Sequence, residues 1–264
     1  MMNKICDVLK KTGLDGVYGP DDFYKKEITL RDNTKSILWV CKNDNHGILD
    51  PDFWENGDFY KKNYRDQFSA KLDSYTDPEE HLKIYKEVNK RQFNQFKNLI
   101  NKNTKFLEIG SSFGGILSHV NKHDIKICDG VEPNYRDVIF GKKRYKNCNI
   151  INDLFETCDF GDKKYNLIVS FEVLEHAFNL KNFITKVNSI LDSDGFINFE
   201  VPNHNDALLI NYKVDKYQSF FYHKAHVHYF TPKSLLRIFS HFGISGSVSG
   251  FQMYPFFNQV YWLY

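Results

Sequence analysis

Residues 105–117, KFLEIGSSFGGIL, carry the pattern that decides the fold. The apolar run Lys105–Ile109 has the length and composition of a buried β-strand. Gly110 then permits a tight turn with unusual dihedral angles, and Gly114 and Gly115 let the backbone approach a ligand where a helix begins. A strand, a glycine-rich turn and a helix in this order are typical of α/β domains that bind nucleotide-like ligands.

The alternation of strand and helix continues along the chain. We predict further strands at residues 126–131, 148–151, 165–171, 195–201, 244–251 and 258–264. The helices between them are expected near residues 78–101, 115–122, 135–144, 180–191 and 231–243. Asp77-Pro78 and Thr231-Pro232 are good helix starts, because an N-cap side chain precedes a proline at the first helical position. The pattern predicts a doubly wound, mostly parallel sheet covered by helices.

The first 75 residues differ from the rest of the chain. Short apolar pieces such as Ser36–Cys41 lie among turn-rich segments there. We therefore expect a small N-terminal lobe over residues 1–75 and a main domain over residues 76–264. An insertion near residues 203–230 interrupts the alternation of the main domain.

Composition narrows the classes of function. Hydrophobic residues make up 42% and charged residues 26% of 264 residues, which is ordinary for a globular protein. A net charge of +2 without a basic stripe argues against a nucleic-acid partner. The apolar runs are too short for membrane insertion. The five cysteines are odd in number and form no C-x-x-C pair, which argues against a disulfide framework and predicts a cytoplasmic protein.

Acidic residues near the glycine turn indicate which ligand it holds. Ser112 replaces the second glycine of the dinucleotide fingerprint, and Glu108 would repel a pyrophosphate but attract a cationic ligand. Glu132 lies 22 residues after Gly110, at the end of the second strand, where a carboxylate can accept hydrogen bonds from both ribose hydroxyls. Asp153 follows the third strand and could meet the adenine amino group.

The motifs EIGSSFGG (108–115), GVEPN (130–134), INDLFE (151–156) and YNLIVSFEVLEHAFNL (165–180) together resemble class I S-adenosylmethionine-dependent methyltransferases. The resemblance covers residues 105–201. It implies a Rossmann-like sheet of seven strands with the last antiparallel, and S-adenosyl-L-methionine as cofactor. The residues that it implies for cofactor binding are Glu108, Gly110, Ser111, Ser112, Gly114, Glu132, Pro133, Asn134, Asp153, Ser170, Phe171 and Glu172.

Two histidines are candidates for the catalytic base. If the methyl acceptor is an alcohol, a positioned histidine helps to remove its proton. His176 follows the fourth strand, and His226 precedes the helix at Thr231. The choice between them stays open, as does a purely structural role for either. His226 and His228 should point the same way if their segment is a strand. No carboxylate stands at a matching spacing, so we expect no metal.

The C-terminal part of the sequence narrows the resemblance. Residues 201–239 and 254–264 look like a bacterial subgroup found with glycan and surface-polysaccharide biosynthesis. The resemblance implies O-methylation of a sugar nucleotide or another small precursor of a bacterial surface glycan, with a phosphorylated or nucleotide-linked sugar as one option. Some relatives bind zinc through cysteines of an N-terminal lobe, but only Cys41 lies in the corresponding stretch, so no zinc is expected there. Relatives often continue further, which leaves a truncated C-terminus open.

Several alternatives remain at this point. A C- or N-methyltransferase is the nearest, and a non-catalytic cofactor-binding module and an NAD-dependent enzyme are the others. The N-terminal lobe could help to select the acceptor or build the contact of a homodimer. The aromatic residues between Tyr212 and Tyr222 either belong to a core or cover the acceptor as a lid.

Overall fold

The computed structural model describes residues 2–55, 59, 77–253 and 256–263. Within these residues, no helix combines the length and the apolar character that crossing a membrane requires. The chain divides into two compact units. The antiparallel-sheet unit contains Met1–Glu55, Leu174–Thr185 and Val201–Tyr264, and the parallel-sheet unit contains Asn56–Val173 and Lys186–Glu200. The predicted boundary near residue 75 lies outside the described residues.

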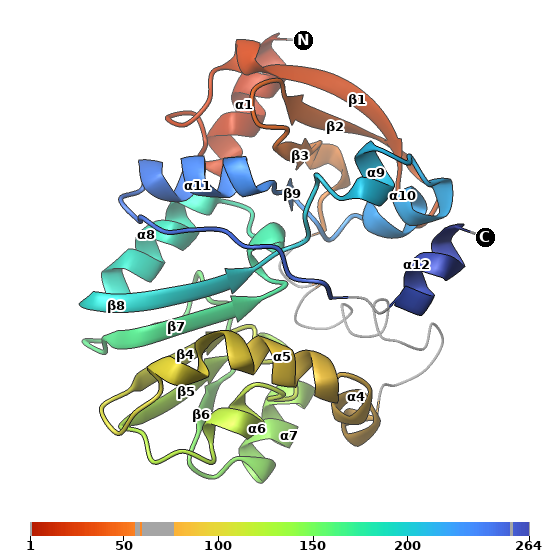
Figure 1. The fold of residues 1–264 in the computed structure, drawn as a ribbon. Coiled ribbons are helices and arrows are strands. Elements are labelled where there is room, and N and C mark those ends of the chain that lie inside the picture. Colours follow the sequence, from red (N-terminus) through yellow and green to blue (C-terminus); the bar gives the residue numbers. More distant parts are fainter. Residues whose placement is uncertain (1, 56–58, 60–76, 254–255, 264) are drawn as a thin grey trace. The chain divides into compact units, whose positions relative to one another are not determined.

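Five parallel strands form the centre of the parallel-sheet unit (Figure 1). They lie in the order β6-β5-β4-β7-β8 and span Asn149–Ile151, Ile127–Val131, Lys105–Ile109, Tyr165–Phe171 and Leu191–Glu200. The predicted α/β fold with a parallel sheet is confirmed. The chain adds β5 and β6 on one side of β4, then β7 and β8 on the other, so the connection order reverses beside β4. Ligands bind such sheets at the carboxyl ends of the strands next to this reversal.

Short helices accompany this sheet. They are α4 (Pro78–Ile84), α5 (Lys86–Phe96), the 3-10 helix η3 (Lys97–Leu99), α6 (Leu117–Val120) and α7 (Tyr135–Arg144). The predicted start at Asp77 is confirmed, because its side chain accepts a hydrogen bond from the Glu80 amide at 2.9 Å. Tyr85 divides the long predicted helix into α4 and α5. The core of the unit includes Phe96, Phe106, Leu117, Val120, Val138 and Ile150.

The prediction of seven strands is wrong in its last two members. Residues 244–251 form no strand, and their glycines and serines have low strand propensity. The second predicted strand is the helix α12 (Phe256–Leu263). Its Trp262 is buried and packs 4.7 Å from the ring centre of Tyr217, so tertiary packing favours a helical face over the predicted strand. The described part of the chain therefore has a five-stranded parallel sheet without an antiparallel member.

A separate antiparallel sheet forms the other unit. Its order is β1-β2-β3-β9, with β1 at Phe23–Thr29, β2 at Lys35–Cys41, β3 at Gly47–Leu49 and β9 at His228–Tyr229. The strand β9 pairs with β3 through Ile48↔His228. The N-terminal strands thus share one sheet with a segment that lies some 180 residues further along the sequence.

Helices complete the antiparallel-sheet unit. They are α1 (Met2–Thr12), α9 (Ala207–Ile210), α10 (Asp215–Phe221), α11 (Pro232–His241) and the 3-10 helices η1 (Pro20–Asp22), η2 (Pro51–Phe53) and η4 (Leu174–His176). The helix α8 (Leu180–Ile190) contributes residues to both units. The predicted cap of α11 is confirmed, because the Thr231 hydroxyl accepts a hydrogen bond from the Ser234 amide at 3.1 Å.

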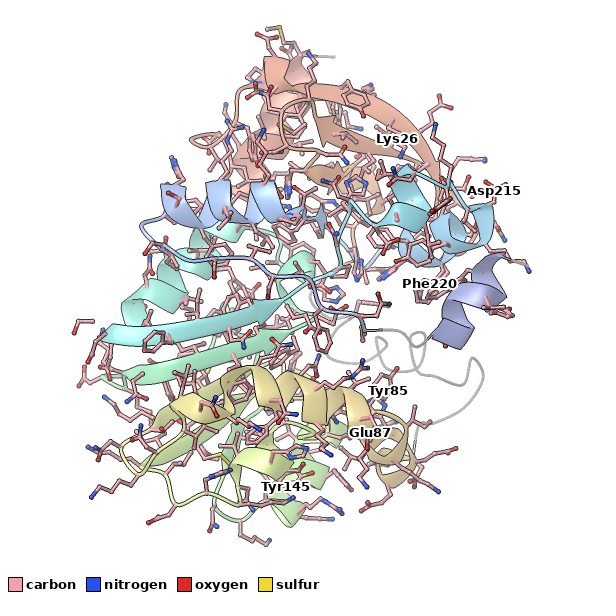
Figure 2. All side chains as sticks on the ribbon, viewed as in Figure 1. Lys26, Tyr85, Glu87, Tyr145, Asp215 and Phe220 are labelled. Carbon is pink, nitrogen blue, oxygen red and sulfur yellow. A yellow bond between two sulfur atoms is a disulfide. The ribbon has the colours of Figure 1, made fainter. Side chains whose placement is uncertain are left out.

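The aromatic residues between 212 and 222 divide into two groups. Tyr217, Phe221 and Tyr222 are buried in the core of the antiparallel-sheet unit. Phe220 lies beside Arg31, whose guanidinium carbon is 4.5 Å from the centre of its ring (Figure 2 labels Phe220). Tyr212 is exposed. Most of this aromatic group therefore belongs to the core, as the more common alternative predicts.

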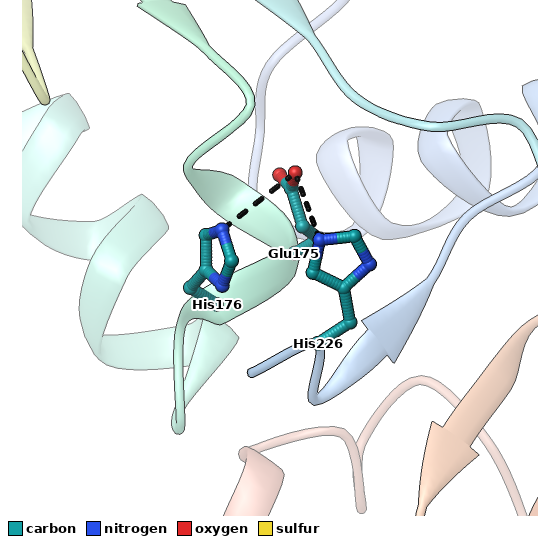
Figure 3. Close-up of side chains that lie close together, drawn as sticks. All are labelled: Glu175, His176 and His226. Carbon is teal, nitrogen blue, oxygen red and sulfur yellow. Dashed lines mark ion pairs between the residues drawn. The ribbon is translucent and has the colours of Figure 1, made fainter. Parts of the chain in front are cut away.

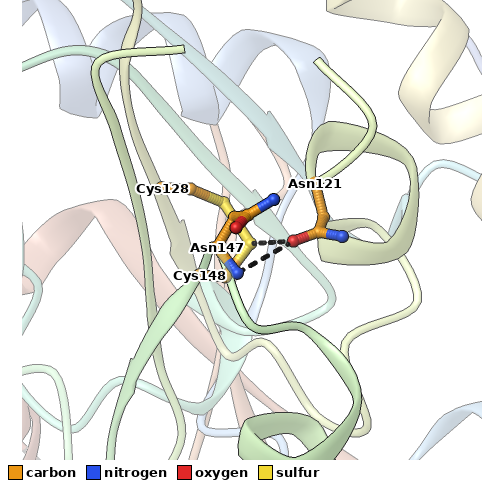
Figure 4. Close-up of a disulfide and its surroundings, with 4 residues drawn as sticks. All are labelled: Asn121, Cys128, Asn147 and Cys148. Carbon is orange, nitrogen blue, oxygen red and sulfur yellow. Dashed lines mark hydrogen bonds between the residues drawn. A yellow bond between two sulfur atoms is a disulfide. The ribbon is translucent and has the colours of Figure 1, made fainter. Parts of the chain in front are cut away.

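Cys128 and Cys148 form a disulfide, which corrects the expectation of no disulfide framework (Figure 4). Cys128 lies in β5 and Cys148 directly precedes β6, and the register Asp129↔Asn149 places the two cysteines side by side. Their Cα atoms are 4.7 Å apart. Parallel neighbours joined by a crossover are distant in sequence, so spacing alone did not reveal this pair. The cytoplasmic location stays a prediction.

Candidate active site

The glycine turn leaves β4 at the reversal of the sheet. The amides of Gly110 and Ser111 both donate to the Val131 carbonyl, at 2.9 and 3.1 Å, which ties the turn to the end of β5. Gly110 has a φ of +76°, and a Cβ atom there would lie 2.3 Å from Cγ2 of Val173. Both the backbone conformation and the space therefore require glycine at this position.

The turn continues with two more residues in the left-handed region. Ser112 has a φ of +49°, which is uncommon for a residue other than glycine. Gly114 has a φ of +79°, and a Cβ atom there would lie 2.3 Å from the ring of Tyr145 (labelled in Figure 2). The Gly114 amide donates to the Ser111 carbonyl at 2.8 Å, so the turn is closed by its own backbone before α6 begins.

Glu132 is fixed by both of its carboxylate oxygens. Its Oε2 accepts a hydrogen bond from the Ser112 amide at 2.9 Å, and its Oε1 accepts one from the Asn134 amide at 2.9 Å. The side chain is buried at the carboxyl end of β5. Each carboxylate oxygen has a second lone pair, so Glu132 can accept further hydrogen bonds from a pair of hydroxyl groups.

Three other predicted cofactor residues already serve the local structure. Asn134 caps α7, and its Oδ1 accepts from the Arg136 amide at 3.0 Å. The Pro133 carbonyl accepts from the Asn152 amide group at 2.9 Å. Oδ1 of Asp153 accepts from the Leu154 amide and the Thr157 hydroxyl, both at 2.8 Å. These contacts position the loops after β5 and β6, and Asp153 keeps its second oxygen for other partners.

Glu108 lies near the end of β4 and is almost fully buried, with 4% of its surface exposed. Burial raises the pKa of its carboxyl well above the ordinary value, and the negative charge of Glu132 raises it further. A backbone hydrogen bond from Leu117 acts in the opposite direction. A cationic group bound nearby would favour the ionised carboxylate, because opposite charges stabilise each other at short range.

Glu172 follows β7 in a strained conformation. Its φ is +57°, and its amide donates to the Glu200 carbonyl at 2.9 Å. Burial raises the pKa of the Glu172 carboxyl to about 8, and the negative charge of Glu200 adds to the shift. Strained residues and displaced pKa values both concentrate at functional sites. Ser170 and Phe171, also predicted for the cofactor, end the same strand.

Glu200 is a site residue that the sequence analysis missed. It ends β8, and Phe171↔Glu200 are paired in the ladder. Its two carboxylate oxygens accept from Gln92 at 2.8 Å and Gln95 at 2.9 Å. The rule that ligands bind at the carboxyl ends of strands could have found Glu200, because it is the last residue of the fifth strand.

The two candidate bases lie together in the antiparallel-sheet unit (Figure 3). The ring centres of His176 and His226 are 4.9 Å apart. Glu175 lies between them, with its Oε1 3.9 Å from Nε2 of His176 and 3.6 Å from Nε2 of His226. The sequence shows no carboxylate at a matching spacing, but the fold supplies Glu175 from the segment after β7.

His226 and His228 were expected to point the same way if their segment is a strand, and this condition is not met. His228 lies in β9, whereas His226 precedes this strand. Nδ1 of His228 is 3.3 Å from Nε2 of the buried His46, and the ring of His226 packs 3.7 Å from that of His223. The strand covers only two residues, so the alternation of side chains does not extend back to His226.

Comparison with known proteins agrees with this fold. A family described as "Methyltransferase domain" matches residues 80–245. No curated protein matches the sequence significantly. Solved structures with similarity include the plantazolicin methyltransferase BpumL in complex with SAH, at 15% identity and a TM-score of 0.49 over 64% of this chain and 71% of that chain.

Two further solved structures have sequence identities and TM-scores in the same range. BpumL with a pentazolic desmethylPZN analogue and SAH has 12% identity and a TM-score of 0.46, over 68% of this chain and 66% of that chain. The YcgJ protein from Bacillus subtilis has 15% identity and a TM-score of 0.45, over 62% of this chain and 67% of that chain. The chain thus spans slightly less than two thirds of BpumL in the pentazolic complex. Because the family match covers more than half of the chain, the protein belongs to the methyltransferase-domain family.

Proposed function

We propose that the protein transfers a methyl group from S-adenosyl-L-methionine to a hydroxyl oxygen of a small acceptor. Family membership supports the transfer of a methyl group. The observation that carries the choice of donor is Glu132, whose two oxygens are held by the Ser112 and Asn134 amides at the end of β5. A carboxylate at the end of this strand can accept hydrogen bonds from the two ribose hydroxyls of an adenosyl group, which supports the proposed donor.

The glycine turn and its acidic neighbours suit a sulfonium ligand better than a dinucleotide. Gly110 leaves no side chain over the turn, and Glu108 places a carboxyl group beside it. A pyrophosphate would meet two carboxyl groups, Glu108 and Glu132, whereas a sulfonium would be attracted by both. Asp153 is proposed for the adenine, and Ser170, Phe171 and Glu172 for the side of the cofactor that faces the reaction.

The acceptor side is proposed from the resemblance of residues 201–239 to methyltransferases of bacterial surface-glycan biosynthesis. A sugar nucleotide or another small precursor of a surface glycan is the acceptor that this resemblance favours. BpumL is solved in complex with desmethylPZN analogues and SAH. We propose that the acceptor proton is handled by the group of Glu175, His176 and His226.

Calorimetric titration tests the donor. S-adenosylmethionine and S-adenosylhomocysteine should bind the wild-type protein, and NAD and NADP should not. Glu132→Ala should weaken both adenosyl ligands by at least about tenfold, because it removes hydrogen bonds to a charged acceptor. Glu87→Ala, which removes an exposed glutamate of α5, is the matched control and should bind like the wild type.

The outcomes separate the alternatives. Binding of nicotinamide cofactors in place of adenosyl ligands would reject the proposed donor. Binding of S-adenosylmethionine without turnover on any sugar nucleotide, phenol, amine or acidic carbon would favour a non-catalytic module. Turnover on an amine or carbon acceptor alone would keep the donor and reject O-methylation.

A further inference from the structure

Three side chains with metal-ligating atoms converge in the antiparallel-sheet unit. Glu175 and His176 belong to η4, and His226 lies just before β9 (Figure 3). One ligand atom from each residue can be chosen such that all three atoms lie within 4.8 Å of one another. Both imidazoles present Nε2 to the same carboxylate oxygen, Oε1 of Glu175, at 3.9 and 3.6 Å.

These nitrogen–oxygen distances are close to the distances between two donor atoms that bind the same metal ion. Two donor atoms bound to zinc at about 2.1 Å in tetrahedral geometry lie about 3.4 Å from each other. The two pairs that include Glu175 would therefore close by about 0.5 Å or less on binding, relative to their 3.9 and 3.6 Å. A separation of this size is also longer than a direct nitrogen–oxygen hydrogen bond.

The tautomer of His176 is set for metal binding. Its Nδ1 lies 2.7 Å from the Ala225 carbonyl oxygen, which can only accept a hydrogen bond. Nδ1 must therefore carry the proton, and in the neutral ring the lone pair is on Nε2, toward Glu175. A ring nitrogen that donates to a carbonyl while the other faces the ion is the usual support of a metal-bound histidine.

The backbone holds the second histidine against η4. The Val227 amide donates to the Glu175 carbonyl at 2.9 Å, and the His226 amide donates to the His223 carbonyl at 3.1 Å. The ring of His223 packs against the ring of His226, with centres 3.7 Å apart. The position of His226 is thus fixed on both sides of its Cα atom before any ligand binds.

Two of the three proposed ligand residues are almost fully buried. Glu175 is 1% exposed and His226 is 8% exposed. A divalent cation and a carboxylate that meet in a buried site offset part of the desolvation cost of each other's charge.

We propose that Glu175, His176 and His226 bind one divalent first-row transition-metal ion, with Zn²⁺ as the best-matched ion. Two imidazoles and one carboxylate are a known ligand set for zinc with an open position. Magnesium and calcium prefer all-oxygen sites, which this group does not provide. The expectation of no metal, which rested on sequence spacing, is replaced by this proposal.

The open position gives the ion a role, and this step rests on the proposed function. With three protein ligands, a tetrahedral ion keeps one position for an oxygen ligand. An acceptor hydroxyl bound there would release its proton to solvent water more readily, because the cation stabilises the oxyanion that remains to attack the methyl group. His176 and His226 would then act as ligands that hold the ion rather than as the base itself.

Metal binding can be measured without any methyl acceptor. The full-length protein is treated with a chelator, dialysed and titrated with Zn²⁺ by calorimetry and with Co²⁺ by visible absorption. We expect one ion per chain and a cobalt spectrum typical of four-coordinate nitrogen and oxygen ligands. His226→Ala and Glu175→Gln should each weaken binding more than about 100-fold, which exceeds the usual effect of losing an outer-shell partner.

His241→Ala is the matched control, because it removes an exposed histidine of the same unit. It should bind the ion like the wild type. Absence of binding to the wild type, or equal binding by wild type, His226→Ala and Glu175→Gln, would overturn the metal site. An equal loss in His241→Ala would show an adventitious surface site and overturn it as well. Glu175→Gln keeps the side-chain shape, so it decides the question if His226→Ala unfolds.

Titration of the same samples with S-adenosylhomocysteine separates the two proposals. Bound metal without bound S-adenosylhomocysteine would reject the proposed donor and keep the metal site. Bound S-adenosylhomocysteine without bound metal would keep the donor and reject the metal site. In the second case, loss of turnover in His176→Ala would return His176 to the role of base.

Discussion

Single residues around the glycine turn carry the chemistry of the parallel-sheet unit. Glu132 is held by two backbone amides, and Glu172 is held in the left-handed region beside Glu200. Burying a carboxyl group costs free energy unless it has partners; Glu132 has two amide partners, whereas Glu172 lies near the like charge of Glu200. The structure thus keeps acidic groups at the strand ends where they can meet a ligand.

Glu172 should make stability depend on pH. Its folded pKa is about 8 and its ordinary value is 4.5, so between these values the unfolded chain loses a proton that the folded chain keeps. The folded state then binds more protons, and the free energy of unfolding falls as pH rises through this window. Glu172→Gln should flatten that fall, as measured by urea unfolding at pH 5 and pH 8.

The matched control for this experiment is Glu87→Gln, which changes an exposed glutamate of α5. It should show the same decrease between pH 5 and pH 8 as the wild type. An equal decrease in the Glu172→Gln variant would mean that Glu172 is ionised in the folded protein at neutral pH.

Gly114 and Gly161 separate backbone strain from steric conflict. Both have a positive φ, +79° and +56°, so alanine is strained at either position. An added Cβ would lie 2.3 Å from the Tyr145 ring at Gly114, but would meet nothing within 4 Å at Gly161. Gly114→Ala should therefore destabilise the protein by more than Gly161→Ala, which should cost about 1–2 kcal/mol. Equal losses in thermal unfolding would show that Tyr145 moves aside freely.

At the scale of elements, the disulfide links two neighbouring strands of the parallel sheet. Cys128 and Cys148 are 20 residues apart and join β5 to the start of β6 across the α7 crossover. Closing a loop of this length restricts the unfolded chain, and replacing both cysteines by alanine should lower the free energy of unfolding by about 3 kcal/mol. Chemical unfolding under non-reducing conditions measures the difference.

Thiol counting checks the same bond directly. The unfolded, unreduced protein should react at three cysteines, Cys6, Cys41 and Cys158, and at five after reduction. Cys6→Ala is the control, because Cys6 is outside the disulfide and should leave most of the stability unchanged. Five reactive thiols before reduction would contradict the bond.

At the scale of the whole molecule, distant parts of the sequence share one sheet. Tyr229 of β9 pairs with Gly47 of β3 and is 1% exposed. Its hydroxyl donates to the His223 carbonyl at 3.2 Å, and its ring packs against Phe221 and Tyr222. The N-terminal strands therefore depend on a segment that is synthesised much later.

Tyr229→Ala should destabilise the N-terminal strands more than the parallel sheet. Loss of a buried aromatic ring costs about 3–5 kcal/mol in a packed core. Hydrogen exchange should accelerate in β1, β2 and β3 and change less in β4 and β5. Tyr212→Ala, which removes a tyrosine that is 71% exposed, should leave both sheets unchanged. Uniform acceleration in both sheets would show that the two units unfold together.

Local sequence patterns were sufficient to predict the strands of the parallel sheet. Lys105–Ile109 and Tyr165–Phe171 are strands with the predicted bounds, because buried parallel strands are continuous apolar runs between turn residues. The cap at Thr231 was also predictable, since it needs only neighbours in sequence. Glu132 was predicted from its distance to the glycine turn, which the length of one strand-helix-strand unit determines, and its role in cofactor binding stays a prediction.

The features that the sequence did not predict depend on contacts between segments that are distant in sequence. The sequence by itself determined a parallel α/β sheet with a glycine turn and acidic strand ends, because these depend on local order along the chain. Only the tertiary structure decided that α12 is a helix, that Cys128 meets Cys148, and that Glu175 joins His176 and His226. Those features depend on which surfaces meet after the chain has folded, and packing free energy there outweighs local propensity.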